Sequence, residues 1–466
     1  MDLGGAMLKF LKQLAATVEV EFVHMGGSYA VRKKDYDPIL LNLLKSHGSF
    51  YNTKRKYPSD PEFIYLTSED EFFIYFPRNL ELPKFVISSV EQLFTQESTK
   101  FVFSPQFQLL PFQENVVRKA LFSNKDLIIE SPCGSGKTFM AMSLISQIQK
   151  ETLILVPTLD LLEQWEDRIR VNLGIEAGVY CGSRKELRPV TISTVQSLLR
   201  FKGVNKLFER FGLLICDEVH RLGAEKWSQV LRFLPMERRI SFSATPDRAD
   251  GLSEVIEAHL GKVEITVPFD ALVKEGIVKV PSVMTIKGSW DVVRKKPYPP
   301  FQLDFTETCN RIAVNNSRNK TILEVIQKGV NSGRKILVGS NRLDQLDQLF
   351  QLCSQNSLDC GLLTGSSKNR RAILKKQVIL SSIQITKEGL DLPELDMMIL
   401  ATPVSDPNTM KQILGRLARI YPDKKFPILV DIVDTDKSKG ESYGALSRMY
   451  SSRRNVYNEM KCSFLN

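Results

Sequence analysis

The sequence predicts an α/β protein in which a small α+β domain precedes two units built on parallel sheets. The chain has 466 residues, well beyond the roughly 250–300 residues at which one hydrophobic core stops growing. From Phe107 onward, short apolar segments alternate with amphipathic ones, which is the rhythm of βαβ units. A segment rich in Pro and Lys at 287–300 divides these units. We therefore expect domains at 1–104, 105–280 and 281–466.

The first domain is expected to combine two hairpins with two helices. Within 13–34, apolar and polar residues alternate on both sides of Gly26-Gly27, which is a hairpin signal. Residues 37–47 have the apolar spacing of a short helix, residues 63–76 suggest a second hairpin, and residues 81–94 suggest a second helix.

Both later units show apolar runs of strand length, bounded by turn signals. In the first unit, the expected strands are 126–130, 152–157, 189–194, 211–218 and 239–245. In the second unit, they are 335–340, 377–385, 395–403 and 426–433.

The composition excludes several classes of protein. No apolar run approaches the ~20 residues that span a bilayer, and the first 20 residues lack the long apolar centre of a signal peptide. The seven cysteines are scattered and include no C-x-x-C pair, which argues against a disulfide scaffold or a zinc site. We therefore expect an intracellular, cytoplasmic protein.

The net charge of +10 is unevenly distributed. Residues 281–466 hold 28 Lys and Arg against 18 Asp and Glu, whereas residues 1–100 and 101–280 are each within one charge of neutral. Such an excess predicts a basic face for a polyanion such as a nucleic acid. A solvated basic surface without a partner is the alternative.

The strongest local motif is SPCGSGKT at 131–138, between an expected strand and an expected helix. Glycines let backbone N–H groups wrap a phosphate, and the helix N-terminus adds its positive dipole end. Lys137 is expected to reach the β- and γ-phosphates of ATP, and the Thr138 hydroxyl to hold Mg²⁺. The nucleotide-binding residues expected in this loop are Ser131, Pro132, Cys133, Gly134, Ser135, Gly136, Lys137 and Thr138.

Two adjacent carboxylates end the expected strand at 211–218. At the C-terminal edge of a strand beside a phosphate loop, Asp217 can hold the metal ion. Glu218 can orient or deprotonate the attacking water. Together with the loop, this pair predicts an ATPase.

Four motifs, in this order over residues 107–420, resemble those of the superfamily-two helicases. They are the phosphate loop, Asp217-Glu218-Val219-His220, Ser243-Ala244-Thr245, and the segment from Gln412 to Arg419. The resemblance implies two tandem RecA-like motor domains that couple ATP hydrolysis to movement on a nucleic acid. It assigns coupling to His220, Ser243, Ala244 and Thr245. It adds Gln412, Arg416 and Arg419 to the catalytic residues, the two arginines as fingers whose guanidinium groups neutralise γ-phosphate charge.

Weaker matches fill the gaps between these motifs. Gln113 resembles the glutamine that reads adenine, although Leu110 stands where an arginine is often found, and Gly389 and Asp391 are also expected at the nucleotide. Trp165 is interpreted as a core aromatic rather than as a stacking residue. The residues expected to contact the nucleic-acid backbone are Pro157, Thr158, Thr191, Thr194, Ser340, Asn341, Arg342, Thr364, Gly365 and Thr386.

Within the superfamily, the DEVH and SATPDR segments look most like the UvsW-type phage enzymes and their XPB-type relatives. The small N-terminal domain with Phe76-Pro77-Arg78 adds to this likeness. The resemblance implies a phage-encoded DNA helicase, expected to be monomeric, that unwinds or branch-migrates forks and junctions in repair, recombination and replication. An RNA helicase, a restriction-type duplex translocase, and a DNA-annealing or scaffold protein regulated by nucleotide stay open as alternatives.

Two cationic clusters stand out in the nearly neutral N-terminal domain. Arg32-Lys33-Lys34 follows the first expected hairpin, and Lys54-Arg55-Lys56 lies between Tyr51 and Tyr57. Cationic loops flanked by aromatic residues can contact phosphates and stack on an exposed base. We therefore expect this domain to select branched over linear DNA, with ordinary solvated turns as the alternative.

Overall fold

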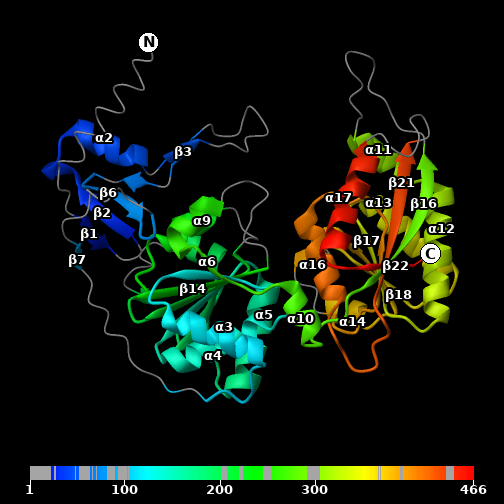
Figure 1. The fold of residues 1–466 in the computed structure, drawn as a ribbon, viewed down its shortest axis with the longest axis horizontal. Coiled ribbons are helices and arrows are strands. Elements are labelled where there is room, and N and C mark those ends of the chain that lie inside the picture. Colours follow the sequence, from blue (N-terminus) through cyan, green and yellow to red (C-terminus); the bar gives the residue numbers. More distant parts are fainter. Residues whose placement is uncertain are drawn as a thin grey trace, which may run out of the picture. The chain divides into compact units, whose positions relative to one another are not determined.

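The computed structural model divides the chain into two compact units, Met1–Ser131 with Gly136–Val267, and Pro132–Ser135 with Pro268–Asn466 (Figure 1). The residues that the structure describes are 22–25, 28–47, 49–51, 63–65, 67–69, 71–80, 90–92, 102, 104–200, 207–219, 224–244, 253–290, 305–365, 367, 369–388, 392–436 and 445–465.

The N-terminal part of the first unit is a mixed sheet with one helix against it. The strand order is β5 (Ser68–Glu69), β6 (Phe73–Pro77), β2 (Ser28–Arg32), β1 (Phe22–Met25) and β7 (Val90–Gln92). Val31, Ile74 and Phe76 form its core with Leu44 of α2 (Pro38–His47). The first expected hairpin and the first expected helix are therefore confirmed, because β1 pairs antiparallel with β2 and α2 follows them.

Two expectations for this part are wrong. The strand β4 (Phe63–Tyr65) pairs with β3 (Ser49–Tyr51), whereas β6 pairs with β5, so the second hairpin has a different partner from the one expected. Residues 90–92 form β7, parallel to β1, rather than the end of a helix. Local periodicity does not show which distant strand has an edge with backbone groups available for pairing. The position of such an edge determined the strand pairing in both cases.

Arg78 attaches this sheet to the rest of the first unit. Its Nε lies 2.8 Å from Oδ2 of the buried Asp126, and its Nη1 donates to the Met236 carbonyl at 2.7 Å. Asn79 adds a bond from its Nδ2 to the same carboxylate at 2.9 Å. Charge-assisted bonds of this kind fix orientation as well as adding stability. The expected domain boundary at residue 104 stays a prediction.

The larger sheet of the first unit contains all five strands expected there. Its order is β11 (Arg184–Lys185), β10 (Gly178–Cys181), β12 (Val190–Thr194), β9 (Thr152–Val156), β13 (Leu213–Asp217), β14 (Arg238–Ser243), β8 (Leu127–Glu130) and β15 (Val263–Thr266). Its helices include α3 (Pro111–Phe122), α4 (Lys137–Ile148), α5 (Leu159–Leu173), α6 (Val195–Leu199), α8 (Ala224–Leu231) and α9 (Ser253–Leu260). These strands pair in parallel, except that β10 is antiparallel to β11. Every residue of β9, β12 and β13 is buried, as sheets covered on both faces require.

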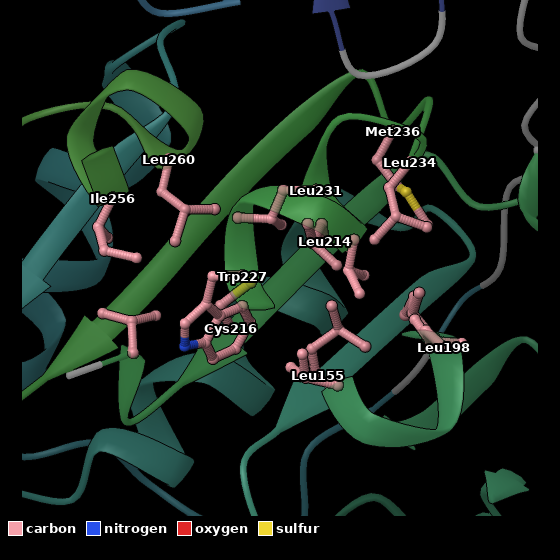
Figure 2. Close-up of a cluster of buried hydrophobic side chains, with 14 of the residues drawn as sticks. Leu155, Leu198, Leu214, Cys216, Trp227, Leu231, Leu234, Met236, Ile256 and Leu260 are labelled. Atoms are coloured by element: carbon pink, nitrogen blue, oxygen red, sulfur yellow. The ribbon is translucent and has the colours of Figure 1, made fainter. Parts of the chain in front are cut away.

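One hydrophobic core of this unit lies between the sheet and helices α6, α8 and α9 (Figure 2). Trp227 and Leu231 of α8 pack there with Leu260 of α9 and Leu214 of β13, all fully buried. Burial also raises the pKa of the Cys216 thiol to about 12, so this cysteine behaves as a small apolar residue.

The second unit is built on one parallel sheet. Its order is β18 (Cys360–Leu363), β19 (Val378–Ser382), β17 (Ile336–Ser340), β20 (Met397–Leu400), β21 (Ile428–Asp436), β16 (Ser282–Trp290) and β22 (Ser463–Leu465). Its helices are α10 (Phe269–Lys274), α11 (Phe305–Ala313), α12 (Asn316–Asn331), α13 (Leu343–Gln355), α14 (Arg370–Leu374), α15 (Ile383–Glu388), α16 (Pro407–Leu417) and α17 (Ala445–Glu459), among the residues that the structure describes. Among the same residues, no helix is both long and apolar enough to cross a bilayer.

Two expectations for the second unit are corrected. Residues 287–290 belong to β16 and not to a linker, because they pair with β21. Residues 383–385 begin α15 instead of extending β19.

Buried ion pairs join helices of the second unit to β21: Arg318 of α12 to Asp434 at 2.9 Å, and Arg453 of α17 to Asp431 at 2.8 Å. Breaking such a pair by removing one partner costs about 3–5 kcal/mol.

Candidate active site

The loop between β8 and α4 has the conformation expected of a phosphate cradle. Gly134 and Gly136 have φ angles of 89° and 81°, a region that glycine occupies without steric cost. A Cβ atom on Gly136 would lie 2.3 Å from Nε2 of Gln113, so a larger residue there would also require the Gln113 side chain to move. The Ser131 N–H donates to the Ser243 carbonyl at 2.8 Å, which ties the start of the loop to the end of β14.

Lys137, the first residue of α4, reaches across the sheet edge. Its Nζ donates to the Ser131 carbonyl at 3.3 Å and lies 3.5 Å from Oε1 of Glu218. Lys137 and Glu218 come from either side of β14, because β13, β14 and β8 are neighbours in that order. The sheet therefore brings together the two residues that sequence reasoning assigned to the phosphates and to the water.

The acidic pair ends β13 and is largely withdrawn from solvent. Asp217 is 5% exposed and Glu218 is 8% exposed. Glu218 has a φ of 52°, a left-handed conformation that is uncommon for residues other than glycine. Such backbone strain persists only where the surroundings enforce it, and it clusters at functional sites.

Helix α5 supplies two contacts that sequence reasoning did not find. Trp165 is buried, as expected of a core aromatic, and its Nε1 also donates to Oδ2 of Asp217 at 2.9 Å. One turn later, Nη1 of Arg168 donates to Oγ1 of Thr138 at 2.7 Å. Positions three apart share a helix face. The signal available in the sequence for these two contacts was that both residues lie on the helix that follows the strand next to β13.

Gln113 lies at the N-terminal turn of α3 and beside the phosphate loop. Its Oε1 accepts from the Leu110 N–H at 2.9 Å, and its amide nitrogen faces Gly136. Nearby, the rings of Phe107 and Phe139 meet edge to face with centroids 5.1 Å apart. Recognition of adenine by Gln113 stays a prediction.

The expected coupling residues are partly described. Ser243 is fully buried at the end of β14, the strand between the acidic pair and the phosphate loop. Ala244 follows it and is half-buried. His220 and Thr245 lie outside the described residues, as do Gly389 and Asp391.

In the first unit, the residues expected at the nucleic acid are engaged internally. Thr158 caps α5 by accepting from the Leu161 N–H, and Thr194 caps α6 by accepting from the Ser197 N–H. Pro157 is buried. Thr191 is fully buried, and its hydroxyl donates to the Arg188 carbonyl at 2.7 Å, so this conformation does not offer it to a phosphate.

The corresponding residues of the second unit divide into exposed and enclosed ones. Ser340 is fully buried against Gln345, and Thr386 is buried with its hydroxyl bonded to the Ser382 carbonyl. Arg342 is partly exposed and donates to Oδ1 of Asn310 at 2.7 Å. Asn341 and Gly365 are exposed, and Thr364 is half-buried.

The arginine motif lies on α16 and just beyond it. Gln412 and Arg416, one turn apart, are 5% and 9% exposed, and Arg419 follows the end of the helix. Lys424 fastens this end by donating from Nζ to the carbonyls of Leu417 at 2.9 Å and of Arg419 at 2.6 Å. Burial lowers the pKa of Lys424 to about 8.

Two parallel-sheet units, the first with a phosphate loop beside an acidic pair, define a nucleoside triphosphatase with two RecA-like domains. Comparison with known families agrees. Residues 106–248 match the family of the res subunit of type III restriction enzymes. Residues 317–421 match the helicase conserved C-terminal domain.

Individual relatives point the same way. A putative ATP-dependent RNA helicase of Acanthamoeba polyphaga mimivirus is 29% identical over 71% of this chain, and the match spans 63% of that relative's length. The DNA 3'-5' translocase XPB2 of Sulfurisphaera tokodaii is 27% identical over 74% of this chain and 84% of its own.

Solved structures share the fold. S. cerevisiae Dbp5 bound to RNA and ADP BeF3 has a TM-score of 0.52 at 15% identity, covering 77% of this chain and 94% of its own. The ATP-dependent Type ISP restriction-modification enzyme LlaBIII bound to DNA has a TM-score of 0.54 at 14% identity, covering 80% of this chain and 32% of its own. The chain belongs to the superfamily-two helicases and is related to the XPB-type enzymes, as predicted. Helicases of this superfamily use ATP.

Proposed function

We propose that this protein is a DNA helicase or translocase, driven by ATP and Mg²⁺, that unwinds or branch-migrates forked and junction DNA. The observation that carries the motor assignment is the approach of Lys137 to Glu218 at 3.5 Å, at the edge that also presents Thr138 and Asp217. A site that only bound nucleotide would have no use for a strained, buried acid beside the phosphate lysine.

The donor set fits Mg²⁺. A threonine hydroxyl and a carboxylate are hard oxygen donors, and Mg²⁺ is usually held by one or two protein oxygens together with substrate phosphates. Among the described residues there is no group of three or more His, Cys, Asp or Glu side chains that would hold a metal without the nucleotide. Thr138 and Asp217 would hold the ion, which when bound neutralises charge on the β- and γ-phosphate oxygens.

The protein's own residues divide the remaining work. The N–H groups at the start of α4, behind Gly134 and Gly136, cradle the phosphates. Lys137 contacts the terminal phosphates. Glu218 orients the attacking water and accepts its proton. Arg416 and Arg419 act on the charge that develops as the terminal phosphoryl group leaves.

The second unit supplies the basic surface for nucleic acid. The whole charge excess of the chain lies in 281–466. Within it, Arg371 on α14 and Lys375 just after α14 are both exposed, shortly after the exposed Gly365. A cationic surface beside accessible backbone suits contacts to phosphates, which position a strand without reading bases.

DNA is favoured over RNA by the XPB-type relationship, since the relative XPB2 is named as a DNA translocase. An RNA helicase is the second candidate, because the mimivirus relative is named as one. No backbone-contacting residue here distinguishes the two, and the 2′-hydroxyl is what a protein would have to detect.

We propose that residues 1–104 select branched over linear DNA. Within the first cationic cluster, Lys33 pairs with Glu69 at 2.6 Å, whereas Lys34 is exposed. The second cluster, Lys54-Arg55-Lys56, lies outside the described residues. Changing this second cluster to alanine should preserve basal ATPase and reduce the preference for forks. An unchanged preference would return the selectivity to the motor domains.

The deciding experiment compares ATPase stimulation and strand separation on single-stranded DNA, duplex DNA, forks, four-way junctions and matched RNAs. Forked and four-way DNA should stimulate most, and Glu218→Gln should bind them without turnover. Stimulation by RNA alone would establish the second candidate. A Glu218→Gln protein that performed every DNA reaction would instead indicate an annealing or scaffold protein.

A further inference from the structure

Helix α5 contacts both of the oxygen groups assigned to Mg²⁺. Its Trp165 donates to Asp217 at 2.9 Å, and its Arg168 donates to Thr138 at 2.7 Å. The two donors stand three residues apart on one helix face. They are not equivalent, because the indole N–H is neutral and the guanidinium carries a full positive charge.

The guanidinium and a metal ion compete for the same hydroxyl. Thr138 is 7% exposed, so its hydroxyl oxygen has few directions from which a partner can approach. A hydroxyl oxygen has two lone pairs; Arg168 uses one of them. In addition, a positive charge at hydrogen-bond distance repels a divalent cation in a region of low water content.

The same charge attracts phosphate. Arginine presents several N–H donors in a planar fork that suits phosphate oxygens. Arg168 begins from a half-buried position next to the loop that cradles them. Leaving Thr138 therefore gives its guanidinium a new partner as soon as a nucleotide is present.

We propose that Arg168 is a further residue of the nucleotide site, which donates to the Thr138 hydroxyl as in this structure and yields that hydroxyl to Mg²⁺ when the nucleotide binds. This inference rests on the proposed ATP and Mg²⁺ site. Its consequence is that Arg168 sets how much Mg²⁺ the protein requires to bind nucleotide. Removing the guanidinium should ease metal binding and weaken metal-free nucleotide binding, which are opposite changes.

The test is equilibrium binding of a fluorescent ADP analogue, measured in EDTA and across a Mg²⁺ series. Arg168→Met keeps the apolar stem and removes the guanidinium. Its half-saturating Mg²⁺ concentration should fall about tenfold, in line with a hydrogen bond to a charged group. Its affinity in EDTA should fall by a similar factor.

Arg170→Met is the matched control. Arg170 lies on the same helix, is exposed, and pairs with Asp167 at 2.6 Å, so both quantities should stay as in the wild type. Arg168→Lys keeps the charge without the fork, so its half-saturating Mg²⁺ concentration and its affinity in EDTA should lie between those of the wild type and of Arg168→Met. This variant also tests the proposal if the methionine variant does not fold.

The outcomes separate the two claims. An unchanged Mg²⁺ requirement in Arg168→Met, or a loss of affinity in parallel with and without metal, would overturn the role of Arg168 and leave the proposed function intact. Nucleotide binding by the wild type that showed no response to Mg²⁺ would contradict the proposed site itself.

Discussion

Nζ of Lys137 lies 3.5 Å from Oε1 of Glu218, although the two residues belong to different strand–loop segments of the chain. The neighbouring order of β13, β14 and β8 produces this approach. It places the lysine expected at the phosphates beside the acid expected at the water. Nucleotide phosphates entering the loop would give Lys137 a new partner and leave Glu218 to the water.

Lys137→Ala should abolish ATP hydrolysis and strand separation while sparing nucleic-acid binding. The lysine faces the phosphate loop, whereas strand contacts are spread over other elements. ATPase assays and low-salt DNA-binding measurements without nucleotide check this. Lys150→Ala is the control and should behave as the wild type. Lys150 lies just after α4, the helix that begins with Lys137, and pairs with Glu237. A parallel loss of DNA affinity in Lys137→Ala would count against separate sites.

Trp165→Phe should raise the Mg²⁺ concentration that half-saturates ATPase by roughly tenfold, because partners behind a metal ligand typically affect affinity by 10–100-fold. The change keeps an aromatic ring and removes the N–H that orients Asp217. Trp227→Phe is the control: this tryptophan is equally buried in the core of Figure 2, and its Nε1 has no hydrogen-bond partner among the described residues. If the Mg²⁺ concentration that half-saturates ATPase changed equally in both variants, the contribution of Trp165 would be packing alone.

Arg416→Ala and Arg419→Ala should each lower kcat by about 10³-fold while ATP affinity changes little, since arginine fingers act chiefly on transition-state charge. Arg454, exposed on α17, offers a control for general loss of positive charge. Steady-state kinetics together with nucleotide-binding measurements separate kcat from affinity. Wild-type turnover in both variants would remove the arginines from the catalytic group.

The affinity for DNA should fall steeply with salt, because each neutralised phosphate releases counterions. Replacing Arg371 or Lys375 by alanine should reduce the slope of log K against log salt by about one for each phosphate that is no longer neutralised. Lys226→Ala, an exposed lysine of α8 in the first unit, should leave the slope unchanged. Equal slopes in all variants would make this basic face a solvated surface.

Stability should fall as the pH drops from about 6.5 toward 3, partly because of His259. Burial, with the nearby charges of Arg239 and Arg232, lowers the pKa of His259 to about 3, against 6.5 when unfolded. The unfolded chain therefore binds the extra proton in this window, and stability present above pH 6.5 is lost below it.

The most that this histidine contributes is about 5 kcal/mol. His259→Gln keeps a polar group that can reach the Ser228 hydroxyl, to which Nε2 of His259 lies at 2.8 Å. Denaturant unfolding at pH 7 and pH 4.5 should show a smaller acid loss in this variant. An identical acid loss would place the sensitivity elsewhere.

The sequence by itself determined the five strands expected in the sheet of the first unit, the four expected in the sheet of the second, and the order of the motifs along them, whereas β10, β11, β15, β16, β18 and β22 were not predicted. These strands are mostly apolar runs of about five residues, and their turn signals are local. The same holds for the phosphate loop, whose glycines must adopt positive φ wherever the loop occurs.

Only the tertiary structure decided which strands are neighbours and which helix faces the site. Residues 90–92 became a strand because β1 offered an edge. Trp165 and Arg168 acquired partners in Asp217 and Thr138, which lie far from them in the sequence. Periodicity reports the buried face of a helix, whereas the identity of what that face contacts depends on packing among distant segments.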